Sequence, residues 1–272
     1  MPRLAVCSWS LQPTGPADLA AKVDACGLDA VQLALDPIRR GEWDEAQTVK
    51  TLADAEITIL SGMIEMAGED YSTLDTIKET GGVRPDSTWD TNLAAAKDNA
   101  ELAARLGLGL VTFHIGFVPH DTADPERNKL IDRCRQIVAF FDAHNIQIAF
   151  ETGQEAADTL LPLLAAMPDS VGVNFDPANM ILYGMGDPID AIRTLAPRVK
   201  QIHIKDASPS KTPGTWGTEQ PAGSGAVDWD AFFGVYRELG LACDLVVERE
   251  GGTQRVEDVR TGATLVRAQG LI

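Results

Sequence analysis

Residues 171–180 read VGVNFDPANM and residues 199–207 read VKQIHIKDA, and each is a short apolar run that leads into polar side chains. Six further stretches have the same character, at residues 4–11, 30–35, 57–66, 109–116, 146–153 and 243–250. Most are nearly continuous in Val, Ile, Leu, Phe and Ala, which is typical of strands covered on both faces. The sequence therefore predicts eight buried, parallel strands.

Amphipathic segments of helical period separate these strands. One of them begins after Asp124 as the N-cap, with Pro125 at the first helical position. Eight alternations of strand and helix have one common closed solution, so we expect an α/β fold, a single (β/α)8 TIM barrel with residues 1–272 as one domain. An open doubly wound sheet is the alternative, but SWSLQPTG at residues 8–15 is not the glycine-rich phosphate turn that such a sheet usually carries. The predicted helices span residues 17–25, 43–55, 89–106, 125–143, 155–167, 188–195, 229–239 and 255–268.

The charge balance narrows the classes of partner. The chain has 272 residues, with 23 basic against 40 acidic side chains and a net charge of −17. Such a surface repels phosphate backbones and anionic lipids, so we expect no nucleic-acid or membrane partner. We find neither a signal peptide nor an apolar stretch of about 18 residues, and we expect a cytoplasmic protein. The four cysteines are widely spaced and predict neither a disulfide framework nor a thiolate metal site.

The later strands end in residue types that bind metals. Glu151, Asp176, His203 and Glu248 lie near the C-terminal ends of strands five to eight. In a parallel barrel these ends converge, and three buried carboxylates would repel one another strongly without a cation. We therefore expect one divalent metal ion. Oxygen ligands suit Mn²⁺, Mg²⁺ or Co²⁺, and the single nitrogen shifts the preference toward Mn²⁺, Co²⁺ or Zn²⁺, of which we favour Mn²⁺. Any one of these residues could instead cap a helix or form an ion pair. That alternative explains all four together less well than a metal site does.

Other residues at the same strand ends are candidates for substrate contact. His114 in the fourth strand and Glu65 near the end of the third should face the mouth of the barrel, although a buried histidine can also be part of the core. Trp9 ends the first strand and could form the floor of a sugar pocket or pack in the core. Lys205 and Asp206 follow His203. We expect Asp206 to orient a metal ligand or to pair with Lys205.

Two connections are too long for plain barrel loops. Residues 68–87 follow the third strand and residues 208–227 follow the seventh. Both leave from the strand C-termini, the face on which barrel enzymes build their sites. The second is either a lid or substrate-binding loop, or a flexible insertion.

Five segments bring a resemblance to a known family. They read AFETGQE at 149–155, VGVNFDPANM at 171–180, QIHIKDA at 201–207, GSGAVDW at 223–229 and LVVEREGG at 245–252. With them the chain resembles the sugar phosphate isomerase/epimerase group of the xylose isomerase-like TIM barrels, which includes ketose 3-epimerases, hydroxypyruvate isomerases and inosose dehydratases. The first half matches mainly by its strand–helix rhythm. The resemblance implies that Glu151, Asp176, His203 and Glu248 hold the metal, and that Glu151 and Glu248 transfer protons on opposite faces of a bound ketose.

The chain also departs from that group. The epimerases have a substrate-holding histidine three positions after the metal aspartate, where this chain has Asn179, and an arginine shortly after the metal histidine, where this chain has SPSK at 208–211. Asn179 and Lys205 therefore stand at substrate-binding positions for a different set of contacts. The DNA-repair endonucleases of the superfamily need more histidines and a basic surface. Xylose isomerase proper needs an Asp-x-Asp ligand pair that is missing.

Three functions stay open. The first is an isomerase or epimerase that acts on a ketose or keto-sugar through a metal-stabilised enediolate. The second is a lyase, either an inosose-type dehydratase or a β-eliminase of 3-keto-glycosides, with Lys205 or His114 as the acid. The third is a barrel that binds a sugar or a protein without catalysis, against which the two glutamates argue. We expect a small-molecule sugar as the partner, and the sequence leaves a homo-oligomer open.

Overall fold

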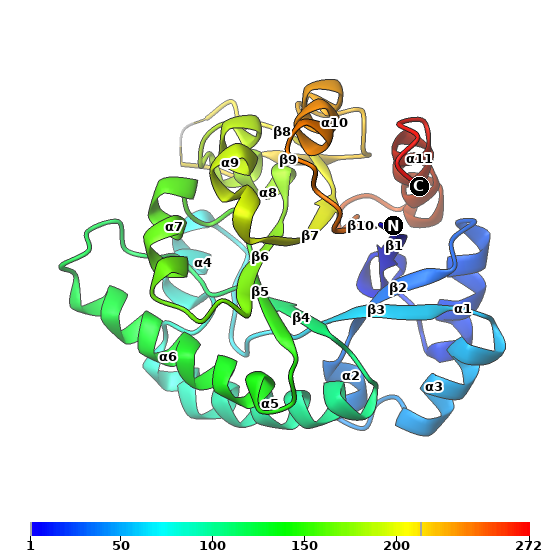
Figure 1. Ribbon diagram of the computed structural model, residues 1–272, viewed down its shortest axis with the longest axis horizontal. Helices are drawn as coiled ribbons and strands as arrows, with labels where there is room; N and C mark the ends of the chain where they lie inside the picture. Colours follow the sequence, from blue (N-terminus) through cyan, green and yellow to red (C-terminus); the bar gives the residue numbers. More distant parts are fainter. Residues whose placement is uncertain (1, 213) are drawn as a thin grey trace.

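Eight parallel strands close into a barrel at the centre of the molecule (Figure 1). The computed structural model describes residues 2–212 and 214–272. Around the barrel the strands follow the order β1-β10-β7-β6-β5-β4-β3-β2, and the prediction of a (β/α)8 TIM barrel is confirmed. The strands are β1 (Leu4–Cys7), β2 (Ala30–Ala34), β3 (Thr58–Met63), β4 (Leu110–Phe113), β5 (Gln147–Glu151), β6 (Val171–Phe175), β7 (Val199–Ile204) and β10 (Asp244–Val247).

Helices on the outside of the barrel connect successive strands, as the alternation predicts (Figure 1). The side chain of Asp124 caps its helix by accepting the backbone N–H of Glu126, with Pro125 at the first position. The predicted helices correspond to α1 (Pro16–Ala25), α3 (Glu45–Asp54), α5 (Asp86–Arg105), α6 (Pro125–Asp142), α7 (Ala157–Ala165), α9 (Pro188–Leu195), α10 (Trp229–Glu238) and α11 (Arg255–Arg267).

All eight strands are shorter than the stretches predicted for them, and two of them end where another element begins. The first ends at Cys7 because the following residues form the 3-10 helix η1 (Ser8–Leu11). The seventh ends at Ile204, after which β8 (Asp206–Ser208) pairs antiparallel with β9 (Thr218–Gln220). The long connection after β7 is therefore partly a hairpin. Four short helices lack a full amphipathic period and were not predicted: α2 (Asp36–Arg39), α4 (Leu74–Thr80), α8 (Pro177–Tyr183) and η2 (Ala196–Arg198).

The interior of the barrel contains a buried polar layer. Ser61 of β3 donates to Gln201 of β7 at 2.6 Å, and Gln32 of β2 donates to Thr112 of β4 at 2.8 Å. Neither pair lies on neighbouring strands, so these bonds cross the inside of the barrel. Seven side chains make up this polar layer, and none is more than 1% exposed: Cys7, Gln32, Ser61, Thr112, Asn174, Gln201 and His203.

A large apolar core fills the space between strands and helices. It includes the fully buried rings of Phe113, Phe150, Phe175 and Phe232. All four cysteines are unpaired. Within the described residues, no helix combines the length and the apolarity needed to cross a membrane.

Candidate metal centre and active site

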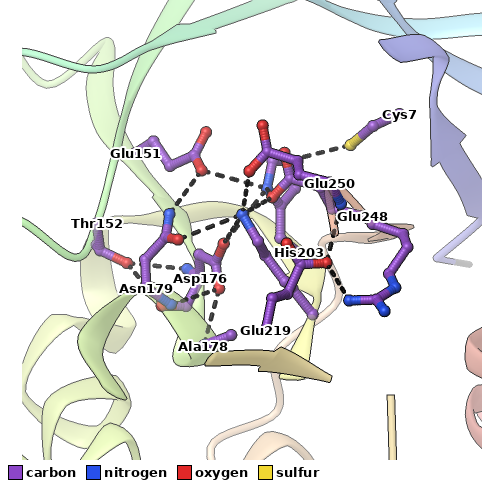
Figure 2. A network of polar contacts seen from close by, with 12 residues as sticks. Cys7, Glu151, Thr152, Asp176, Ala178, Asn179, His203, Glu219, Glu248 and Glu250 are labelled. Carbon is purple, nitrogen blue, oxygen red and sulfur yellow. Dashed lines mark hydrogen bonds and ion pairs between the residues drawn. The ribbon is translucent and has the colours of Figure 1, made fainter. Parts of the chain in front are cut away.

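The four residues predicted as metal ligands lie together at the C-terminal ends of the strands (Figure 2). Glu151 ends β5, Asp176 follows β6, His203 lies in β7 and Glu248 follows β10. All are at most 4% exposed, and one ligand atom from each lies within 4.8 Å of the others. The parallel topology explains the cluster, because it brings the ends of four strands to one side of the barrel.

One nitrogen of His203 faces the three carboxylates. Its Nδ1 lies 3.1 Å from Oε2 of Glu248, 3.5 Å from Oε1 of Glu151 and 3.9 Å from Oδ2 of Asp176. Three carboxylate oxygens and one imidazole nitrogen are a donor set that divalent ions such as Mn²⁺ or Zn²⁺ accept.

Asp176 gives a separate indication that a cation fits here. Its Oδ1 accepts the backbone N–H groups of Ala178 and Asn179 at 2.8 and 3.1 Å, and so caps α8. Its Oδ2 is buried and has no hydrogen-bond partner. A buried carboxylate oxygen without a partner is costly, so an ion that accepts Oδ2 as a ligand removes that cost.

The electrostatics of the carboxylates differ from one another. Burial, with Glu248 and Glu151 nearby, raises the pKa of Asp176 well above its usual value despite Lys205. Burial acts in the same direction on Glu248, but Lys205 and His203 outweigh it and hold the pKa of Glu248 well below its usual value. Burial also opposes ionisation of Glu151, yet His114 and His203 lower its pKa. Glu151 and Glu248 are therefore the carboxylates best suited to be ionised in the unliganded protein.

Lys205 is buried beside the same centre. Its Nζ lies 2.9 Å from Oε2 of Glu248, 2.6 Å from Oε2 of Glu250 and 3.8 Å from Oδ2 of Asp176. Burial would lower the pKa of Lys205, but these carboxylates keep it well above its usual value. The site therefore contains a fixed ammonium group next to one of the predicted bases.

Three other predicted residues contact the two glutamates. Trp9 donates its indole N–H to Oε1 of Glu248 at 2.8 Å, and Asn179 donates its amide N–H to Oε1 of Glu151 at 3.0 Å. His114 Nε2 lies 3.5 Å from the same oxygen of Glu151. Each glutamate is thus held by at least one uncharged N–H donor.

A cavity of about 400 Å³ opens beside this centre. Trp9, Met63, His114 and Glu248 are among the residues that line it. Glu65 also lines it, but its side chain is 60% exposed and pairs with Arg40 at the rim. The predicted role of Glu65 is therefore restricted to the outer part of the cavity.

The expectation for Asp206 is wrong. Both of its carboxylate oxygens accept N–H groups of the connection after β7 and of α10, with no room for a role toward a metal ligand or Lys205. Its donors are the backbone N–H groups of Ala207, Gly223, Gly225 and Val227 and the indole of Trp229. Gly225 is required at this position, because a Cβ there would lie 2.1 Å from Oδ1 of Asp206. Asp206 therefore anchors the long connection at residues 208–227.

Comparison with known proteins assigns the chain to a family. A family model described as "xylose isomerase-like TIM barrel" matches residues 20–269. The chain belongs to this family. A solved xylose isomerase domain protein from Planctomyces limnophilus is 30% identical, with 92% of this chain and 91% of that chain covered and a TM-score of 0.84.

Two more distant solved structures share the fold alone, and one further protein matches a short segment of the sequence. The IOLI protein, solved with a zinc atom, is 15% identical over 98% of this chain and 97% of its own, with a TM-score of 0.76. An L-ribulose 3-epimerase is 15% identical over 99% of this chain and 94% of its own, with a TM-score of 0.74. The uncharacterized protein YihM of Escherichia coli (strain K12) is 49% identical over 49 residues, which are 18% of this chain and only 15% of that protein.

Sequence reasoning missed part of the site of this xylose isomerase-like barrel. Gln32 and Asn174 both approach Nε2 of His203, at 2.7 and 2.9 Å. Glu250 also contacts Lys205 and lines the cavity. The sequence feature that could have indicated Gln32 and Asn174 is an amide side chain in the middle of an apolar strand, in VQLA and in VGVNF.

Proposed function

We propose that this chain is a divalent-metal-dependent isomerase or epimerase of a ketose or keto-sugar, with Glu151 and Glu248 as the paired bases. The observation that carries the proposal is that both glutamates reach one buried centre, each with a lowered pKa and each oriented by an N–H donor. Glu151 lies at the end of β5 and Glu248 follows β10, and β7 and β6 lie between these two strands in the barrel. Epimerisation at carbon requires oriented carboxyl groups on both sides of a bound sugar, one ionised to take a proton and the other carrying a proton to deliver.

The metal would be held by Glu151, Asp176, His203 and Glu248, with Mn²⁺ favoured and Mg²⁺, Co²⁺ or Zn²⁺ as alternatives. When bound, the ion would supply positive charge that stabilises an enediolate of the substrate. The zinc in the IOLI structure supports a divalent ion in this fold without naming the ion used here.

Side chains of this protein would carry out the proton transfers. One glutamate takes the proton from the carbon next to the carbonyl, and the electron pair of that C–H bond forms the C=C bond of the enediolate. In an isomerisation the same carboxyl returns the proton to the former carbonyl carbon, while the hydroxyl proton of the enediolate moves to the oxygen of the former carbonyl and the new C=O bond forms at the first carbon. In an epimerisation the other glutamate, protonated, delivers a proton to the opposite face, and exchange with solvent restores both carboxyls. Trp9 and Asn179 keep the two carboxylates in place.

A lyase is the second candidate, and Lys205 favours it. Its ammonium lies within 3.3 Å of Asn179 and 2.9 Å of Glu248. From there it could protonate a leaving oxygen after a base has removed the proton from carbon. Such a reaction releases water or an alcohol, whereas an isomerase product has the mass of its substrate.

Incubation of the Mn²⁺-loaded protein with a panel of ketoses in D₂O tests the proposal. We expect deuterium at one carbon next to the carbonyl, detected by NMR, and a product whose mass differs from that of the substrate only by the incorporated deuterium. Glu248→Gln should stay folded and lose the exchange, while Glu238→Gln on the exposed face of α10 should keep it. Absence of both deuterium and an isomeric product with every ketose rejects the isomerase or epimerase, and loss of water from a keto-polyol supports the lyase.

A further inference from the structure

A chain of hydrogen bonds leads from His203 into the polar layer of the barrel. Nε2 of His203 lies 2.7 Å from Oε1 of Gln32. The amide nitrogen of Gln32 donates to Oγ1 of Thr112 at 2.8 Å, and the Thr112 hydroxyl donates to the sulfur of Met63 at 2.8 Å. His203, Gln32 and Thr112 are fully buried, so these groups depend on one another for partners.

The sulfur of Met63 fixes the direction of the chain. A thioether has no proton, so the Thr112 hydroxyl hydrogen is directed to it, and the hydroxyl oxygen accepts from Gln32. The amide of Gln32 then has its NH₂ group toward Thr112 and its carbonyl toward His203. A carbonyl only accepts, so Nε2 of His203 carries a proton and donates it. The other nitrogen, Nδ1, faces Glu248 and Glu151 at 3.1 and 3.5 Å.

Two further groups approach the same nitrogen. Nδ2 of Asn174 lies 2.9 Å from Nε2 and 3.4 Å from Oε2 of Glu151. An NH₂ group and a protonated Nε2 would both be donors, so the proposed direction places the carbonyl oxygen of the Asn174 amide toward Nε2 as a second acceptor. The Cys7 thiol lies 3.6 Å from Nε2 and 3.5 Å from Oε1 of Gln32, to which it donates. The carbonyl of Gln32 makes the shortest of these contacts with Nε2.

The barrel is irregular where it presents these amides. The pairing of β2 with β3 shifts between Val31 and Gln32, and that of β6 with β7 shifts between Val173 and Asn174. Such bulges re-aim side chains and occur next to functional sites. Both shifts fall at the residues whose amides meet His203.

We propose that Gln32 is a positioning residue of the metal centre. It holds His203 in the tautomer that keeps its proton on Nε2 and leaves the lone pair of Nδ1 for the metal. Metal-binding histidines usually donate their second ring nitrogen to a carboxylate, a carbonyl or water, and here a glutamine carbonyl from the opposite part of the barrel takes that place. The inference rests on the proposed metal centre and is independent of the reaction that the centre performs.

Three variants separate this role from simple packing. Gln32→Met removes the acceptor with little change in volume. Gln32→Glu keeps an acceptor next to Nε2. Gln201→Met changes an equally buried glutamine of the same layer, which bonds Ser61 and Asn174 instead of His203. The melting temperature of each variant reports folding.

Metal affinity and the tautomer are the two measurements. Calorimetric titration with Mn²⁺ should show binding about 10–100-fold weaker in Gln32→Met, as expected for loss of a group that orients a ligand. Gln32→Glu and Gln201→Met should remain within a few fold of wild type. In the Zn²⁺-loaded protein, long-range ¹H–¹⁵N NMR should show the proton of His203 on Nε2, with the signal assigned by its loss in His203→Asn.

The outcomes are distinct. A Zn²⁺-loaded wild type in which Nε2 has no proton overturns the inference, as does an equal loss of affinity in Gln32→Met and Gln201→Met. Should Gln32→Met fail to fold, the tautomer of His203 in the wild type and the Mn²⁺ affinity of Gln32→Glu still test the role of Gln32. A wild type that binds neither ion rejects the metal centre and this inference together, whereas one that binds but does not exchange deuterium rejects only the proposed reaction.

Discussion

The ammonium of Lys205 lies 2.9 Å from Oε2 of Glu248, and both groups are almost completely buried. Burial alone would favour the neutral form of each side chain. Their proximity has the opposite effect, since the pKa of Lys205 is raised and that of Glu248 is lowered. A predicted base is thus kept ionised by a cation that also pairs with Glu250, which lines the cavity.

Lys205→Met should reduce kcat by about 10²–10³-fold, the range for loss of one fixed group that stabilises developing negative charge. Lys200→Met, on the same strand outside the proposed centre, is the matched control and should retain the wild-type rate. Initial rates with the ketose identified in the exchange experiment provide the measurement. Wild-type turnover in Lys205→Met would exclude the lysine from the chemistry of both the isomerase and the lyase.

Asp176→Asn should separate helix capping from metal binding. The asparagine oxygen can still accept from Ala178 and Asn179, but an NH₂ group replaces the unpartnered Oδ2. Without metal we expect a variant at least as stable as wild type, because a carboxyl group that is costly to ionise beside Glu151 and Glu248 is replaced by a neutral amide.

Excess Mn²⁺ should then stabilise only the wild type, by about 2.7 kcal/mol at one hundred times Kd. Melting with and without Mn²⁺ measures the difference. Asp187→Asn is the control, since Asp187 caps α9 through Ile189 and Asp190 in the same way but lies on the surface. An unchanged Mn²⁺ response in Asp176→Asn would remove Asp176 from the ligand set.

Ketose phosphates should be poorer substrates than free ketoses. Arg40 at the cavity is paired with Glu42 and Glu65, and Lys205 is paired with Glu248 and Glu250. In the part of the chain that the structure describes, the cavity therefore offers a phosphate no unpaired arginine or lysine. The carboxylates that line it are Asp36, Glu65, Glu69, Glu248 and Glu250.

Placing like charges together costs several kcal/mol, so kcat/KM should fall by at least about 100-fold on phosphorylation. Glu65→Gln should reduce the difference in kcat/KM between a ketose and its phosphate. Glu42 also pairs with Arg40 but does not line the cavity, so Glu42→Gln should reduce this difference in kcat/KM less than Glu65→Gln does. Equal kcat/KM values for a ketose and its phosphate would show that the acidic lining does not select the substrate.

The sequence predicted those parts of the site that topology alone determines. Glu151, Asp176, His203 and Glu248 could be found because parallel strands bring their C-terminal ends together. The contacts of Asp206 could not be found, because they depend on the path of a connection that returns to it from Gly223 and Trp229.

The role of Gln32 was hidden for another physical reason. Gln32 and His203 are 171 residues apart, and their contact depends on a register shift that the pattern of apolar residues does not encode. An amide in the middle of an apolar strand indicates a buried polar partner. The partner itself appears only when the barrel is closed.

Glu155, outside the proposed centre, should make stability depend on pH. It is 5% exposed, both of its carboxylate oxygens lack hydrogen-bond partners, and burial raises its pKa to about 8. In the unfolded chain a glutamate has a pKa of about 4.3. Between these two values the folded state holds a proton that the unfolded state has released, so stability falls as pH rises.

The total loss between pH 4 and pH 9 is on the order of 4–5 kcal/mol, from about 1.4 kcal/mol per unit of pKa difference. Glu155→Gln cannot ionise and should not suffer this loss. We expect the variant to be the more stable protein at pH 9, with the advantage shrinking toward pH 4, as measured by urea unfolding across that range. Glu101→Gln on the exposed face of α5 should parallel the wild type at every pH. A difference between wild type and Glu155→Gln that is the same at pH 5 and pH 9 would mean that Glu155 finds a partner and ionises in the folded protein.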